Sequence, residues 1–215
     1  MILLDRYFAQ RGRLPLTGRH ILAHYDATTI VVYQAYKRSI GLGAALDGRF
    51  GQEWSRTRMS WIKTSFLWMM HRCGWATKQN QEIVLAIRIM RSGFDEMLRC
   101  AVSSLFDPEA YSNRDMWSAE VAMSDVRLQW DPDRDPLGMP LERRAIQLGL
   151  RRGVLNRFAD EWIVGIEDIT SLVREQHARV IAGNLGELEL PREVLYPVSC
   201  PMIAKRLGMD VELCA

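Results

Sequence analysis

The sequence predicts an α+β fold, namely a single domain with a mixed β-sheet flanked by helices. Its 215 residues match the usual size of one domain. Hydrophobic residues make up 48% and charged residues 25% of the chain, which excludes a disordered protein and provides enough apolar surface for a core. Segments rich in β-branched residues alternate imperfectly with helical patterns, which favours a mixed sheet over a doubly wound parallel one.

The expected strands differ in their hydrophobic patterns. Residues 28–36 and 82–90 are dense in β-branched and apolar side chains, which predicts two buried strands. Residues 125–130 alternate between apolar and polar side chains, as in a half-buried strand, and residues 144–150 are a fourth candidate. Residues 59–62 are either a short strand or the entry to a helix.

Helices and loops are expected between these strands. The predicted helices cover residues 37–46, 64–73, 93–105 and 160–181. Thr64 or Ser65 is the expected N-cap of the second helix, and Gly74 ends it. Polar, Gly-rich or Pro-rich loops are expected at residues 48–58, 107–119 and 131–138, the second of which is alternatively a short helix. Residues 191–215 carry three prolines and form a docked or loose tail.

The charge is nearly balanced at +2, but 24 of the 28 basic residues are arginines. Arginine binds carboxylates and phosphates in a bidentate manner, so a nucleotide or RNA partner fits, although a coding bias that replaces lysine fits equally well. The sequence contains no apolar run long enough to span a membrane and no signal peptide at its start. We therefore expect a cytoplasmic protein with no membrane partner, while the oligomeric state stays open.

Metal and cofactor motifs are absent from the sequence. The four cysteines lie far apart with no C-x-x-C pair, so neither a zinc knuckle nor a redox motif is indicated. His20 and His24 are four residues apart but lack the carboxylate of an H-E-x-x-H motif. No P-loop or complete G-x-G-x-x-G motif is present either. We expect no metal and no cofactor.

The first candidate site lies at the predicted start of the helix over residues 64–73. Lys63 precedes this start, where backbone N–H groups and the helix dipole favour an anion. Together with Thr64 and Ser65, it could hold a phosphate or a carboxylate. The alternative is that Ser65 is only a cap and Lys63 only a surface charge. A nucleophilic Ser65 would need a base that no sequence motif supplies.

The second candidate site follows the strand over residues 125–130. Gln129 lies at the strand end, and Asp131 and Arg134 lie just beyond it, where sheet proteins often bind ligands. Asp131 could act as a general base and Arg134 as an anion clamp, or both could merely stabilise a turn. Arg144 and Gln147 form a third cluster with the same alternatives. We expect residues 58–65 and 129–134 to line one cavity, with Lys63 and Arg134 facing it.

Four tryptophans recur every seven residues, at positions 54, 61, 68 and 75. An aromatic stripe of this kind can stack nucleobases. The same spacing on a buried helix is typical of core packing, and Trp54 lies in a predicted loop, so the stripe need not be continuous.

Five segments carry a resemblance to a known family: IVVYQAY (30–36), RMSWIKTSFLWMMHRCGWATK (58–78), QEIVLAIRIMRSGF (81–94), RLQWDPDRD (127–135) and RAIQLGLR (144–151). The chain resembles the bacterial and fungal family called domain of unknown function 4291 over residues 19–182. It departs from the family pattern at Thr64, His71 and Cys73, where proline, tyrosine and serine are usual, which weakens any role for residues 71 and 73.

The resemblance implies a link to fungal arginine-containing cyclodipeptide synthases, which take aminoacyl groups from charged tRNA. In that reading, Arg134 and Arg144 meet the RNA 3′ end, Asp131 holds a guanidinium or amine, and Ser65 or Lys63 assists transfer of an arginyl group. The implied catalytic residues are Lys63, Ser65 and Asp131. The implied substrate-binding residues are Tyr33, Gln34, Tyr36, Arg58, Trp61, Gln129, Trp130, Arg134, Arg144 and Gln147.

Two other functions stay open. A mixed sheet with Tyr33, Gln34 and Arg58 could belong to a divergent ADP-ribosyltransferase-like domain that binds NAD, although no Q/E-x-E motif is identifiable. The chain could also be a non-enzymatic RNA- or nucleotide-binding module.

Overall fold

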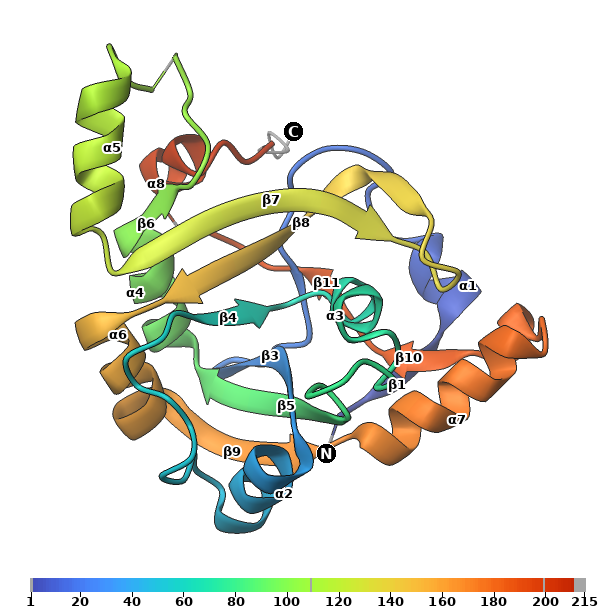
Figure 1. Ribbon diagram of the computed structural model, residues 1–215. Helices are drawn as coiled ribbons and strands as arrows, with labels where there is room; N and C mark the ends of the chain where they lie inside the picture. Colours follow the sequence, from blue (N-terminus) through green and yellow to red (C-terminus); the bar gives the residue numbers. More distant parts are fainter. Residues whose placement is uncertain (1, 109, 199, 211–215) are drawn as a thin grey trace.

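A seven-stranded mixed sheet forms the centre of the protein (Figure 1). The computed structural model describes residues 2–108, 110–198 and 200–210. In spatial order the strands are β6 (Ala101–Ser103), β7 (Val126–Arg134), β8 (Pro140–Leu150), β4 (Ser60–Lys63), β3 (Thr29–Tyr36), β5 (Ile83–Met90) and β9 (Ile163–Asp168). Neighbouring strands are antiparallel except β6 and β7. The predicted α+β domain is confirmed.

Helices and two small sheets surround this sheet. The helices are α1 (Tyr7–Arg11), α2 (Arg38–Asp47), α3 (Phe66–Cys73), α4 (Arg91–Cys100), α5 (Arg114–Met123), α6 (Arg152–Arg157), α7 (Thr170–Ile181) and α8 (Pro201–Arg206). A π-helical turn, η1 (Phe158–Trp162), and a 3-10 turn, η2 (Leu185–Glu187), also occur. Strand β1 (Leu4–Arg6) pairs with β10 (Glu189–Pro191), and β2 (Leu22–Ala23) pairs with β11 (Val194–Leu195). The described part of the tail is therefore docked.

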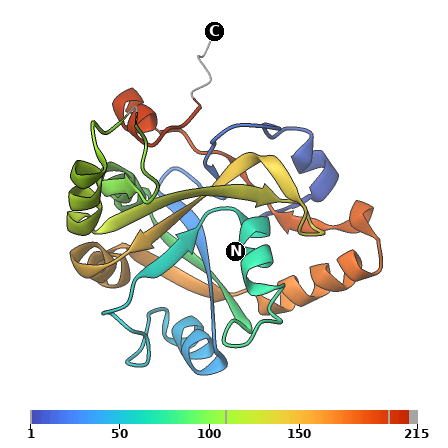
Figure 2. The ribbon, with the colours of Figure 1, turned by 45° about the horizontal axis from the view of Figure 1, so that its top comes forward.

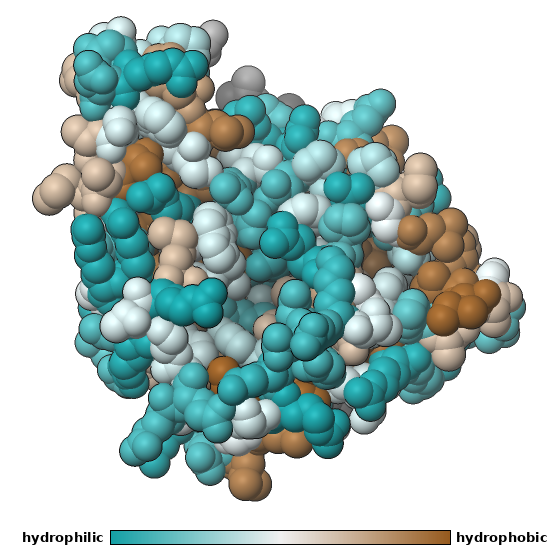
Figure 3. Space-filling model, in the orientation of Figure 1, coloured by the Kyte–Doolittle hydropathy of each residue, from teal (hydrophilic) through white to brown (hydrophobic). Residues whose placement is uncertain are grey.

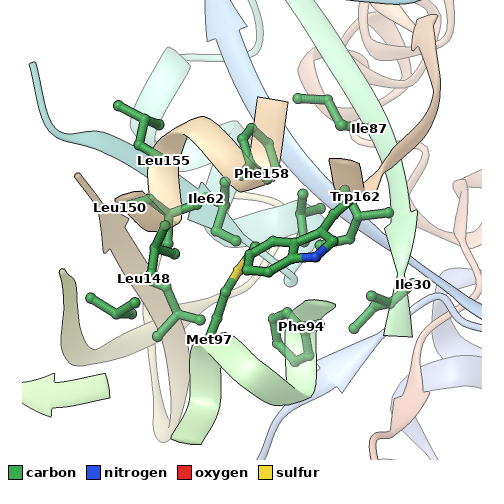
Figure 4. Packing of buried hydrophobic residues seen from close by; sticks show 14 of the residues in the cluster. Ile30, Ile62, Ile87, Phe94, Met97, Leu148, Leu150, Leu155, Phe158 and Trp162 are labelled. Atoms are coloured by element: carbon green, nitrogen blue, oxygen red, sulfur yellow. The ribbon is translucent and has the colours of Figure 1, made fainter. Parts of the chain in front are cut away.

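The sheet has a hydrophobic core on each face. On one face, side chains of α4, α6 and η1 pack against inward-facing strand residues; Phe94, Met97 and Trp162 lie at its centre (Figure 4). A Cβ at Gly93 would lie 2.5 Å from the Trp162 ring, so the glycine allows α4 this close approach. On the other face, α3 and α7 cover β3 and β5. Helix α3 also contacts the end of β7 near Asp133 and Arg134, while the start of β7 lies away from it (Figures 1 and 2).

The predicted helix over residues 160–181 is wrong. The chain forms η1, then strand β9, and only then helix α7. Trp162, Ile166, Ile169 and Val173 have helical spacing, but they come from different elements that meet in the interior. The β-branched pair at residues 163–164 favours a strand, and pairing with β5 decides the outcome.

Two other boundaries differ from prediction. The helix expected over residues 93–105 ends at Cys100, because residues 101–103 pair with β7 as strand β6. The loop expected over residues 131–138 instead continues β7 as far as Arg134. Pro132 cannot donate a backbone hydrogen bond, and the register shifts between Pro132 and Arg134, so the strand tolerates the proline at an irregularity.

Candidate functional site

A cavity of about 450 Å³ opens where β3 and β4 separate. These strands share a single registered pair, Tyr33 with Lys63. Beyond it, side chains from both faces of the sheet line the cavity, including Gln34, Tyr36 and Ser60 from one face and Trp61 and Lys63 from the other. The separation of the two strands therefore opens the central sheet at this point.

A ring of polar side chains fixes one wall of the cavity. Gln34 Nε2 donates to Ser60 Oγ at 2.7 Å and to the Trp61 carbonyl at 3.1 Å. The Tyr36 hydroxyl donates to Gln34 Oε1 at 3.0 Å and accepts from Trp54 Nε1 at 2.8 Å. The Gln34 side-chain amide thus forms hydrogen bonds to β4 at the point where β3 and β4 separate. The ring stabilises the opening and gives its wall a fixed hydrogen-bonding pattern.

Lys63 adds an amine to the cavity lining. The side chain is buried, and Nζ lies 3.5 Å from the Trp61 carbonyl oxygen. Burial, and to a smaller extent the nearby positive charge of Arg72, lower the pKa of this amine to about 8, while Asp131 acts in the opposite direction. An amine with this pKa exchanges a proton near neutral pH, unlike an exposed lysine.

The cavity rim is positively charged. Arg58 and Arg72 line it and are exposed. Glu53 is the one acidic residue among those lining the cavity. Its Oε2 forms an ion pair with Lys37 Nζ at 2.7 Å. The available cations therefore suit an anionic ligand such as a phosphate.

A row of polar side chains continues from Lys63 across the sheet. Lys63 is paired with Gln147 on β8, and Gln147 with Gln129 on β7. Gln147 Nε2 donates to Gln129 Oε1 at 2.8 Å and to Asp131 Oδ2 at 2.6 Å. The structure brings these four residues to one face. However, residues 129–134 do not line the 450 Å³ cavity, so the expectation that Lys63 and Arg134 face one cavity is wrong; the two segments share only a space of about 20 Å³, lined by Ser65 and Asp133.

Ser65 and Tyr33 lie outside the cavity wall. Ser65 is the N-cap of α3: its Oγ accepts from the Trp68 backbone N–H at 3.3 Å and donates to Asp133 Oδ1 at 3.0 Å. Tyr33 is fully buried against Phe66, and its hydroxyl has no hydrogen-bond partner in the described chain. Both side chains therefore belong to the packing and hydrogen bonding of the interior and not to the cavity.

Three other predicted residues also point elsewhere. Trp130 faces the α4 side of the sheet, and its Nε1 donates to the Leu207 carbonyl at 2.8 Å. The Arg134 guanidinium lies 5.7 Å from the Trp68 ring centre and donates to the Gly138 carbonyl at 3.2 Å. Arg144 is exposed on β8. The seven-residue tryptophan spacing likewise does not form one stripe: positions 54, 68 and 75 are buried in separate environments.

Sequence reasoning missed Ser60, Trp54 and Arg72 as cavity residues. Alternation along a strand over residues 60–63 places Ser60 and Trp61 on opposite faces, so only the gap between β3 and β4 brings both into one cavity. No sequence pattern indicates the gap between β3 and β4.

A second buried polar cluster joins α3 to distant parts of the chain. Arg143 Nε donates to Asp133 Oδ2 at 2.7 Å, and both side chains are buried. Glu193 accepts from the Phe66 backbone N–H at 2.6 Å, and burial raises the pKa of its carboxyl well above the ordinary value. The space beside this cluster is about 20 Å³, which is too small for a substrate.

The family model described as "Domain of unknown function (DUF4291)" matches residues 20–196. The chain belongs to this family. Among curated proteins, none matches the sequence. The described residues contain no group of three or more His, Cys, Asp or Glu side chains placed to hold a metal ion. None of the described helices is long and apolar enough to cross a bilayer.

Proposed function

We propose that the protein is a transferase that moves an aminoacyl group from the 3′ end of a charged tRNA to an amine, as a cyclodipeptide synthase does. The observation that carries this proposal is the buried Lys63 amine, which lines a cavity whose rim bears Arg58 and Arg72. The arginines suit the phosphates of the RNA end, and the amine suits proton transfer at the ester. Such a reaction takes place in the cytoplasm, where charged tRNA is found.

The reaction assigns one chemical role to Lys63. The amine of the second amino acid attacks the ester carbonyl, so a C–N bond forms as the C–O bond to the ribose breaks. Neutral Lys63 accepts the proton that the attacking nitrogen loses and returns it to the departing 3′ oxygen, so the protons balance. The Gln34–Ser60–Tyr36 ring offers hydroxyl groups to position the acyl group. Asp131 lies on the same face of the sheet as Lys63 and is available to a cationic substrate group.

An ADP-ribosyltransferase function has less support. It needs a carboxylate aimed at the substrate, whereas Glu53 is exposed and paired with Lys37 and Ser39. A binding module without activity is distinguished from the transferase by the experiment that follows.

The test is incubation with charged tRNAs, arginyl-tRNA among them, followed by mass spectrometry for linear and cyclic dipeptides. We expect product from the native protein and at least a hundredfold less from Lys63→Met, because the proton acceptor is lost. Lys205→Met removes an exposed lysine on α8 and should leave product formation unchanged. Absence of product with every amino-acid pair, or full activity of Lys63→Met, would contradict the proposal.

A further inference from the structure

An uncovered part of the central sheet lies directly beside the cavity. On this face the register places Arg127 of β7, Gly149 of β8 and Trp61 of β4 side by side. Helix α3 begins beyond the far end of β4 and leaves this part of the three strands open (Figures 1 and 2). The same side of the molecule is largely hydrophilic (Figure 3). We call these three residues the indole platform.

The Trp61 ring makes no aromatic, cation–π or hydrogen-bonding contact within the described residues. The other six tryptophans each stack on a ring, face a guanidinium or donate a hydrogen bond: Trp54, Trp68, Trp75, Trp117, Trp130 and Trp162. Trp61 does none of these within the described chain, and its side chain is half-buried. A Cβ at Gly149 would lie 2.6 Å from Met59 Sδ and 3.0 Å from the indole, so the glycine lets both side chains lie directly on the sheet. The indole therefore lies on the sheet near the Met59 thioether, and the part of the ring that is exposed is available for stacking.

Arg127 supplies a cation with no anionic partner. Its Nε is buried without a hydrogen bond, and the guanidinium forms no ion pair with a described acidic residue. Neighbouring strands lie about 4.8 Å apart, so the Cα atoms of Arg127 and Trp61 are about 10 Å apart. A stacked base and its phosphate can bridge this separation with the reach of the arginine side chain.

We infer that the indole platform binds the terminal nucleoside of single-stranded RNA. The base stacks on Trp61, Arg127 contacts a phosphate, and Gln129 reads the base edge through Nε2, because its Oε1 already accepts from Gln147. This inference rests on the proposed function, since Trp61 also lines the cavity and the esterified ribose would then face Lys63. It identifies where the RNA donor docks.

Binding of a short deacylated RNA ending in cytidine-cytidine-adenosine tests this inference. Fluorescence anisotropy at one fixed ionic strength gives the Kd. We expect Arg127→Gln and Trp61→Leu each to raise the Kd at least tenfold, because each removes a direct contact. Arg174→Gln removes an equal charge from an exposed position on α7 and should change the Kd less than twofold.

Several outcomes would overturn the inference. Equal effects of Arg127→Gln and Arg174→Gln would show that only net charge matters. Trp61→Phe keeps a stacking ring, so a loss as large as that of Trp61→Leu would exclude stacking. Product formation from full-length charged tRNA without binding of the short RNA rejects the platform alone. Binding of the RNA without any product rejects the transferase alone.

Discussion

Lys63 lowers the stability of the folded protein and, at the same time, provides a reactive amine. Its amine is buried at the cavity wall, where Nζ lies 3.5 Å from the Trp61 carbonyl oxygen. A protonated amine loses solvation there, and Asp131 restores only part of that loss. The side chain therefore weakens the folded state in order to present a proton acceptor near neutral pH.

Replacement of Lys63 by methionine is expected to stabilise the protein at pH 7 by about 1–3 kcal/mol, because it removes a buried cation. In the folded state the pKa is about 8, against the ordinary 10.5, so the unfolded chain binds more protons between these values. The unfolding free energy of the native protein therefore rises with pH across this window, and the gain from methionine shrinks. Urea unfolding at pH 7 and pH 10 measures both effects, and a gain that is constant with pH would contradict the explanation.

At the scale of secondary structure, local patterns predicted the elements whose residues carry their own signal. The strands over residues 29–36 and 83–90 were evident from β-branched density, and Ser65 and Gly74 correctly bounded α3. Strand β9 was missed because its apolar residues share helical spacing with η1 and α7. The sequence indicated Lys63, Gln129, Asp131 and Gln147 as candidates, but not their alignment, since the β4–β8–β7 register depends on long-range pairing.

Ser65→Ala tests whether this serine belongs to the helix or to the chemistry. The variant loses the N-cap of α3 and the bond to Asp133, so we expect a loss of about 1–2 kcal/mol in unfolding free energy. Dipeptide formation should be unchanged below the melting temperature, because Ser65 lies outside the cavity. Ser171→Ala, at an exposed position of α7, should cost less than about 0.5 kcal/mol. A loss of product with native stability would instead make Ser65 part of the reaction.

At the scale of the whole molecule, the buried cluster around Asp133 joins segments that are far apart in the sequence. Arg143 bonds to Asp133 within the β7–β8 hairpin and donates to the Pro15 carbonyl at 3.3 Å near the N-terminus. Glu193, in the C-terminal segment, accepts a hydrogen bond from the Phe66 backbone N–H in the first turn of α3 and so joins this segment to the cluster. Sequence patterns could not reveal this cluster, because its members share no local spacing.

Arg143→Met leaves the Asp133 carboxylate buried without its charge partner. We expect the unfolding free energy to fall by about 3–5 kcal/mol, as measured by denaturant unfolding. The double variant Asp133→Leu with Arg143→Met should cost less than the sum of the two single variants, because neither charge is then left alone. A single-variant loss below about 1 kcal/mol would show that the cluster does not hold these segments together.

The single registered pair between β3 and β4 has a consequence for stability engineering. Each additional main-chain hydrogen bond between β3 and β4 would stabilise the folded sheet and, at the same time, narrow the entrance to the cavity. Variants selected only for thermal stability should therefore tend to pair these two strands more completely. They would lose ligand access to the cavity while their fold stays unchanged.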